Sequence, residues 1–157
     1  MKKIVKYIYQ TPVAKIVIKA NASVLTELNI INTIVVEQDW QINPVIEKTV
    51  PQLEEYFSGE RESFQLPLGF HYYTEFQRLV WKALLEIPYG STRSYKEIAK
   101  AIGKPASCRA VGNACGQNRF PIIVPCHRVV AADGKIGGFS AELSIKRYLL
   151  KLEGNNK

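Results

Sequence analysis

Residues 122–130 constrain the fold more than any other stretch of the chain. Their β-branched side chains predict a buried segment. Pro125 interrupts this segment, because it fixes its own φ angle and biases Val124 toward an extended conformation. The chain is therefore predicted to turn at Cys126 instead of running straight through a sheet. The turn places a thiol beside the imidazole of His127, one of the two histidines in the chain.

The neighbouring residues Cys126 and His127 predict either nucleophilic chemistry or simple packing. A cysteine is a nucleophile only as its thiolate, so a base or a positive charge must favour its ionisation. His127 and the next residue, Arg128, are candidates for this role. The alternative is that the cysteine is buried and packs like a small apolar side chain. The turn predicted at Pro125 favours the chemical interpretation.

Composition and cysteine usage narrow the class of protein. The chain has 157 residues, of which 46% are hydrophobic, which is enough for one ordinary domain or two small ones. No apolar run has the length of a membrane span, and the first residues lack the cleavage site of a signal peptide. The three cysteines form no CxxC pair, so we expect free thiols, no zinc knuckle and a cytoplasmic location. The net charge of +7 favours a nucleic acid as partner, although a solvated basic surface is the alternative.

The first half of the chain predicts a small antiparallel sheet and a helix. Three runs of strand-forming residues are found at positions 3–9, 13–20 and 33–37. Asn43 and Pro44 then predict a helix start, and apolar residues at helical spacing continue to Ser58. Pro51 lies inside this helix, so we expect a kink or two shorter helices. The turn-rich residues 60–73 connect to the second half.

The second half predicts a helix-turn-helix. Two capping boxes, at residues 74–77 and 94–97, each predict a helix start. The second of these helices closes at Gly103, and another helix over residues 108–118 follows. Two short helices joined by a tight turn are typical of a DNA-binding helix-turn-helix, although any αα-hairpin has the same outline.

The helix over residues 108–118 is rich in small residues, which let another molecule or helix come close. The partner that comes close is either a nucleic-acid groove or a neighbouring helix. Arg109, near the start of this helix, can enter a groove; the alternative is that it is an ordinary surface arginine. A closing helix then ends near Glu153 and Gly154. Glu153 is either a surface carboxylate or a third group that folds back to hold the tautomer of His127.

Several motifs together resemble one family, the O6-alkylguanine-DNA alkyltransferases, also called methylated-DNA–protein-cysteine methyltransferases. The likeness extends over roughly residues 74–154. It rests on five segments: Pro125-Cys126-His127-Arg128-Val129, Arg109-Ala110-Val111-Gly112, Asn118, Gly137-Gly138-Phe139-Ser140 and Leu152-Glu153-Gly154. The resemblance implies repair of double-stranded DNA, in which an alkyl group, such as methyl, moves irreversibly from O6-alkylguanine to Cys126. One molecule repairs one lesion, without a cofactor or a metal.

The resemblance also implies roles for individual residues. Cys126 matches the acceptor thiol, His127 its base acting through a water, Glu153 the carboxylate that orients this base, and Asn118 the brace of the turn. The implied DNA contacts are Arg109, Tyr95, Ser94, Ala110 and Gly112, with Arg109 filling the place of the flipped base. The implied substrate pocket is formed by Tyr95, Val129, Ser140 and Pro125. A monomer is expected. Activity on O4-alkylthymine, cooperative binding and the preferred alkyl size stay open.

The chain departs from the family pattern at three places. Ala141-Glu142 replaces a glycine pair after the serine of the pocket loop, and Phe120 lies where a smaller or proline-bearing turn is frequent. The zinc site of some members is absent, because all cysteines lie in the second half and His71 is alone near the connection. These departures do not affect Cys126.

Residues and resemblance together predict an α/β (α+β) protein. Residues 1–70 are expected to form an N-terminal domain with a small antiparallel sheet and a helix. Residues 71–157 are expected to form a helical domain that contains the helix-turn-helix and the alkyl acceptor. Two alternatives are a module that binds lesions without chemistry, whose known examples lack the acceptor cysteine, and a thiol hydrolase with a Cys–His–Glu arrangement.

Overall fold

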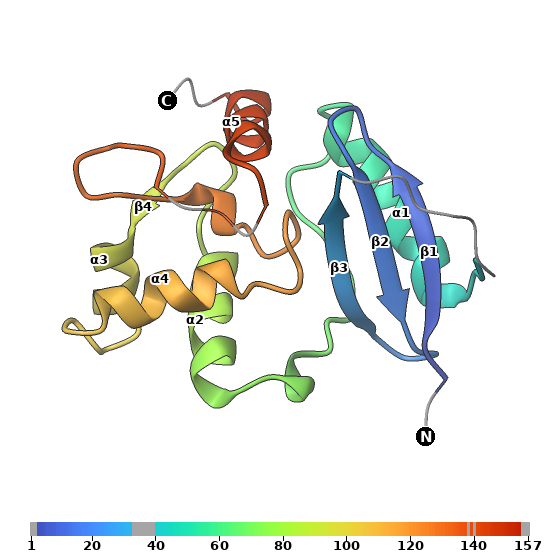
Figure 1. Cartoon of the computed structure of the whole chain (residues 1–157), viewed down its shortest axis with the longest axis horizontal. Helices are drawn as coiled ribbons and strands as arrows, with labels where there is room; N and C mark the ends of the chain where they lie inside the picture. Colours follow the sequence, from blue (N-terminus) through green and yellow to red (C-terminus); the bar gives the residue numbers. More distant parts are fainter. Residues whose placement is uncertain (1–2, 33–39, 138, 140, 155–157) are drawn as a thin grey trace. The chain divides into compact units, whose positions relative to one another are not determined.

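The computed structural model describes residues 3–32, 40–137, 139 and 141–154 (Figure 1). The chain divides into two compact units, Met1–Tyr72 and Tyr73–Lys157. Each unit has its own core. No helix among the described residues is long and apolar enough to cross a membrane.

The first unit contains a three-stranded antiparallel sheet in the order β1-β2-β3. Its strands are β1 (Val5–Gln10), β2 (Lys15–Ala20) and β3 (Leu25–Ile31). Alternate residues of β2 are buried and face helix α1, which covers one side of the sheet (Figure 1). The expected strand at residues 33–37 lies outside the described residues. The third strand is instead formed by β3, which the sequence patterns did not predict.

Helix α1 (Pro44–Phe57) starts as predicted, because the Asn43 side chain accepts a hydrogen bond from the Ile46 amide (3.0 Å). Of the two alternatives expected at Pro51, a kink or two shorter helices, the second is excluded, because α1 is one continuous helix. Pro51 and Glu47, whose carbonyl loses its helical partner there, are both exposed, so that water can satisfy the carbonyl. Leu53, Tyr56 and other buried residues anchor the helix on both sides of the proline. The short helix η1 (Phe70–Tyr72) ends this unit.

The second unit is mainly helical. Its elements are α2 (Glu75–Leu85), β4 (Arg93–Ser94), α3 (Tyr95–Ala101), α4 (Cys108–Gly116), η2 (Cys126–Arg128), β5 (Val129–Val130) and α5 (Leu143–Leu152). Both predicted capping boxes are present, at Thr74 and at Ser94. Strands β4 and β5 pair in parallel, which joins the start of α3 directly to the residues that follow η2. The α+β fold class, with an N-terminal sheet and helix and a C-terminal helix-turn-helix, is therefore confirmed.

The core of the second unit is built around Trp81. Its indole nitrogen donates a hydrogen bond to the carbonyl of Ala114 (2.9 Å), which fastens α2 to α4. Tyr73 and Phe120 pack edge-on against the same indole, with ring centroids 5.1 and 6.0 Å away. Phe120, one of the departures from the family pattern, is thus a fully buried member of an aromatic cluster.

We expect Thr74→Ala to lower the free energy of unfolding by about 1 kcal/mol, because the Thr74 hydroxyl accepts the Gln77 amide hydrogen bond that caps α2. Urea unfolding measures this. Ser63→Ala is the control, since Ser63 is exposed and does not cap a helix. Equal losses in the two variants would show that the cap at Thr74 contributes no more than an ordinary surface hydroxyl.

Candidate active site

The turn before Cys126 is held by Asn118. Its side-chain nitrogen donates to the carbonyl of Val124 (2.8 Å), and its side-chain oxygen accepts from the amide of Phe120 (2.9 Å). Ile122, between these two contacts, has a φ of +75°, which is strained for a β-branched residue. Asn118 is buried and uses both ends of its amide to stabilise this strained backbone. The loop thereby delivers Cys126 in one orientation.

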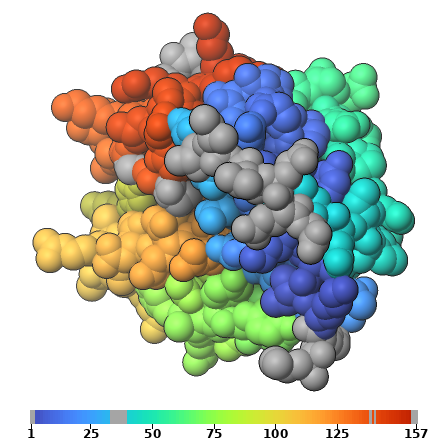
Figure 2. Space-filling model, turned by 45° about the vertical axis from the view of Figure 1, so that its right-hand side comes forward, coloured from blue at the N-terminus to red at the C-terminus, as the bar shows by residue number. Residues whose placement is uncertain are grey.

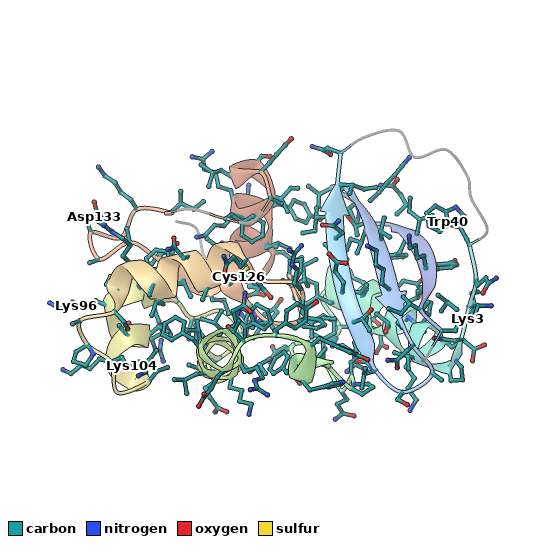
Figure 3. All side chains as sticks on the ribbon, turned by 60° about the horizontal axis from the view of Figure 1, so that its bottom comes forward. Lys3, Trp40, Lys96, Lys104, Cys126 and Asp133 are labelled. Atoms are coloured by element: carbon teal, nitrogen blue, oxygen red, sulfur yellow. The ribbon has the colours of Figure 1, made fainter. Side chains whose placement is uncertain are left out.

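Cys126 is the first residue of η2 and is buried in the second unit, where Figure 3 labels it. The residue is 3% exposed. Pro125 precedes η2, and its carbonyl accepts the amide hydrogen of Arg128 (3.0 Å), which closes the single turn of η2. After this turn the chain enters β5, whose pairing with β4 fixes the position of Val129 opposite Arg93. Cys126 is therefore anchored on both sides.

His127, Arg128 and Glu153 form a buried charged cluster. His127 Nε2 lies 2.7 Å from Glu153 Oε2. Arg128 donates to both oxygens of the same carboxylate, at 2.8 and 3.0 Å, and a third time to the carbonyl of Ile87 (2.7 Å). Glu153 is therefore not a surface carboxylate: in the structure it is buried and contacts His127. The ring of Tyr89 packs against the guanidinium, 5.6 Å away.

This cluster determines which nitrogen of His127 carries the proton. A carboxylate can only accept, so Nε2 donates to Glu153 and the neutral ring has its lone pair on Nδ1. Nδ1 is buried and has no hydrogen-bond partner among the described residues. Burial lowers the pKa of His127 below its ordinary value of 6.5, while the hydrogen bond that His127 donates to Glu153 opposes this shift. The imidazole is therefore a neutral base at neutral pH, with Nδ1 ready to accept a proton.

Lys146 is a site residue that the sequence did not indicate. It is fully buried, and its ammonium donates to the carbonyl of Val129 (2.7 Å). Burial lowers the pKa of Lys146 from 10.5 to about 8, while the nearby thiols of Cys126 and Cys115 raise it. The attraction is mutual, so the ammonium favours the thiolate of Cys126. The one signal in the sequence that could have indicated Lys146 is its spacing: it follows Ile145 and lies seven residues, about two helical turns, before Glu153.

A pocket of about 190 Å³ opens at Cys126. Its lining residues are Tyr95, Gly112, Cys115, Gly116, Cys126 and Phe139. Tyr95 was expected to line the substrate pocket and Gly112 to contact DNA, whereas no role was predicted for Cys115. The predicted pocket residues Pro125 and Val129 are buried but do not line this space. Ser140 and Gly138 lie outside the described residues.

Tyr95 is held in the pocket by the loop that follows β5. Gly137 has a φ of +71°, and a Cβ atom there would come within 3.0 Å of the Tyr95 hydroxyl. Only glycine allows the loop to approach the ring this closely. The same loop ends in Ala141-Glu142, which departs from the family pattern, and Glu142 precedes α5 without making a side-chain capping bond. The pocket is thus walled by α3, α4 and this loop.

The residues predicted to contact DNA lie on or beside the helix-turn-helix. Ser94 caps α3 by accepting from the amide of Glu97 (3.0 Å), so its hydroxyl is already engaged in the fold. Arg109 and Ala110 are exposed at the start of α4, which Figure 2 shows at the surface of the second unit in yellow to orange. Exposed lysines occur nearby at Lys96, Lys100 and Lys104, and Figure 3 shows the first and last pointing outward. Such a surface can neutralise phosphates.

The described residues include no group of three or more His, Cys, Asp or Glu side chains that could hold a metal ion. His71 is exposed and stacks on Tyr72 with ring centroids 4.1 Å apart. The groups brought together at the site are a thiol, a neutral imidazole and an orienting carboxylate. In this arrangement, the imidazole removes the proton of a nucleophile and the carboxylate stabilises the charge that results.

Two family models match the chain. The 6-O-methylguanine DNA methyltransferase DNA-binding domain matches residues 75–155, and the ribonuclease-like domain of the same family matches residues 4–70. Among curated proteins, the methylated-DNA--protein-cysteine methyltransferase of Methanosarcina barkeri is 48% identical over 153 residues, which cover 95% of this chain and 96% of that protein.

Solved structures agree with these matches. O6-methylguanine methyltransferase of Mycobacterium tuberculosis superposes with a TM-score of 0.83 at 42% identity, covering 96% of this chain and 93% of that one. A structure of Mycobacterium tuberculosis OGT in complex with DNA has the same TM-score of 0.83 at 43% identity, with coverage of 94% and 91%.

We expect Glu153→Ala to lower the free energy of unfolding by about 3–5 kcal/mol, because it leaves the buried guanidinium of Arg128 without its counter-charge. Urea unfolding measures the loss. Glu153→Gln keeps the side-chain volume and one acceptor oxygen, so it should lose less. Exposed Glu86→Ala is the control, expected to change stability by about 0.5 kcal/mol or less. If Glu153→Ala behaved like this control, the cluster would not stabilise the fold.

We expect Lys146→Met to slow the alkylation of Cys126 by iodoacetamide at pH 7 by roughly 3- to 10-fold, because the ammonium that favours the thiolate is lost. Lys146 carries its charge below a pKa of about 8 and loses it above, so the difference from the wild type should shrink as the pH rises past that value. Peptide mapping assigns the modified cysteine. Lys151→Met, on the exposed side of α5, should react like the wild type. A constant rate ratio between pH 6 and 10 would contradict the electrostatic role of Lys146.

Proposed function

Because this chain belongs to the family of 6-O-methylguanine DNA methyltransferases, we propose that Cys126 is the cysteine that accepts the alkyl group. The family relationship shows that the protein binds DNA and repairs it by alkyl transfer. The proposed transfer is irreversible and stoichiometric and ends on one of the protein's own cysteines. The activity of the protein is that of a methylated-DNA–protein-cysteine methyltransferase, and in this proposal each molecule performs the transfer once. The open question is which side chains carry the reaction.

The surroundings of the three cysteines support Cys126 as the acceptor. Cys108 is exposed at the start of α4, away from the pocket. Burial and the charge of Cys126 raise the pKa of Cys115 to about 12, so Cys115 is a protonated thiol at neutral pH. Cys126 lines the pocket, adjoins the neutral base His127 and feels the charge of Lys146. The observation that carries the assignment is the buried Nδ1 of His127, which has no hydrogen-bond partner among the described residues and belongs to the residue that follows Cys126 in the chain.

The proposed reaction is a single displacement at the alkyl carbon. His127 Nδ1 takes the proton of Cys126, through a water in the mechanism that the family implies, and Glu153 stabilises the imidazolium. The sulfur of Cys126 then forms a bond to the alkyl carbon, and the bond from that carbon to O6 of guanine breaks with its electron pair on the base. The imidazolium releases its proton and the leaving guanine anion takes one up, so that His127 is neutral again and the step balances. A thioether has no ionisable hydrogen, so the acceptor is not regenerated.

The substrate that we propose is double-stranded DNA with an O6-alkylated guanine. An atom inside the base stack cannot reach a buried thiol, so the base must leave the duplex at a cost of a few kcal/mol. Exposed Arg109 can fill the vacated place, and Tyr95 and Gly112 of the pocket can hold the flipped base. Ala110, exposed beside Arg109, leaves room for the DNA backbone, and Ser94 supports this surface as the cap of α3.

The remaining parts of the proposal concern organisation. Residues 71–157 act as the DNA-binding and acceptor domain and residues 1–70 as a separate α/β domain, consistent with the two family models. The active form is a monomer in a reducing, cytoplasmic environment, in line with the three free cysteines. Pro125, Val129 and Asn118 support the site by holding the backbone around Cys126, and the carbonyl of Val129 also binds Lys146.

Incubation with excess duplex DNA that contains one O6-methylguanine tests this assignment. We expect the intact mass to rise by one methyl group, and peptide mapping to find the methyl on Cys126. Cys126→Ala should gain no mass and still bind the DNA, whereas Cys108→Ala should react like the wild type. A methyl group on any other cysteine, or an unchanged wild-type mass with DNA bound, would overturn the assignment.

A further inference from the structure

Two thiols, not one, face the pocket of the second unit. Cys126 enters it from η2, and Cys115 enters it from the last turn of α4. Both residues line the same pocket of about 190 Å³, and both are buried, Cys126 at 3% and Cys115 at 6% exposure. The methyl-transfer reaction uses one of them, so the mechanism leaves a function for Cys115 unassigned.

A single positive charge couples the two thiols. Lys146 interacts electrostatically with both Cys126 and Cys115, and each thiol also affects the other. The charge of Cys126 raises the pKa of Cys115, whereas Lys146 lowers it. A chemical change that makes Cys126 neutral removes its upward effect on the pKa of Cys115 and keeps the downward effect of Lys146. Cys115 then ionises more easily than before.

We propose that Cys115 is the resolving thiol for oxidised Cys126, so that peroxide converts the pair into a reversible disulfide. The inference rests on the proposed role of Cys126 as the reactive thiolate. The oxidant is hydrogen peroxide: the thiolate of Cys126 attacks one oxygen, the O–O bond breaks, and sulfenic acid and hydroxide form. Cys115 then attacks the sulfur of Cys126, and its proton leaves with the displaced hydroxyl group as water.

The chemistry of the site explains why a resolving thiol matters here. A thiolate favoured by a base and an ammonium is also the species that peroxide oxidises. Without a partner, sulfenic acid proceeds to sulfinic acid, which is irreversible and would destroy the acceptor before it meets a lesion. A disulfide stops at a reducible stage. Cys108 is not placed to act as the resolving thiol, since it does not line the pocket. It lies seven residues before Cys115 on α4, which separates the two residues by about 10 Å along the helix axis.

The test treats the full-length protein, in the absence of DNA, with a small excess of hydrogen peroxide. In the wild type we expect the intact mass to fall by two hydrogen atoms, with a linked peptide pair that contains Cys115 and Cys126. Dithiothreitol should then restore methyl acceptance to nearly the untreated level. In Cys115→Ala we expect Cys126 to gain two oxygen atoms and acceptance to stay lost after dithiothreitol. Cys108→Ala is the matched control and should behave like the wild type.

Two results would overturn the proposal: sulfinic acid on Cys126 of the wild type without the linked peptide, or equal recovery of Cys115→Ala and the wild type. Cys115→Ser provides a second variant, and DNA binding by untreated samples verifies that each variant is folded. The untreated wild type is also assayed with O6-methylguanine DNA. If it fails to accept methyl, the proposed function fails, and the peptide map reports on the disulfide independently of that result.

Discussion

The buried carboxylate of Glu153 is the group on which the rest of the site depends. Glu153 directly follows α5 and accepts hydrogen bonds from His127 and from Nε and Nη2 of Arg128. Nη1 of Arg128 in turn donates to the carbonyl of Ile87, after α2. One side chain thus links three segments of the second unit and also fixes the tautomer of the base. A charge is stable at this depth only because it is paired and fully hydrogen-bonded. The geometry for chemistry and the stability of the unit therefore rest on the same contacts.

Local signals in the sequence predicted much of the fold. The caps at Asn43, Thr74 and Ser94 mark helix starts that the structure contains, because each depends on residues within one turn. Strand β3 escaped prediction because it carries Glu27 on its outer face, where cross-strand pairing with Lys19 at 3.0 Å compensates the weak strand propensity. The effect of Pro51 was likewise decided by exposure, which a sequence pattern does not reveal.

The candidate site was predictable where its residues are adjacent and obscure where they meet only in space. Cys126 and His127 are neighbours in the chain, and the chemical meaning of a thiol beside an imidazole is general. The lysine at position 146 looks like any surface lysine, and only the fold shows its ammonium bound to the carbonyl of Val129. The same holds for Cys115, which shares a pocket with Cys126 although eleven positions separate them. Contacts that depend on how α4 and α5 pack cannot be read from spacing.

Burial and charge act in opposition on the base, and their balance suits a reaction that occurs once. Burial lowers the pKa of His127 and keeps it neutral, while Glu153 raises that pKa and makes the imidazole a stronger base. Arg128 shares the carboxylate and weakens the second effect, so His127 does not become permanently charged. A hydrolase that uses a thiol needs, in addition, a way to activate water and release its product. In the reaction proposed for Cys126, a thioether ends the process, so the buried charges need only favour the thiolate and receive its proton.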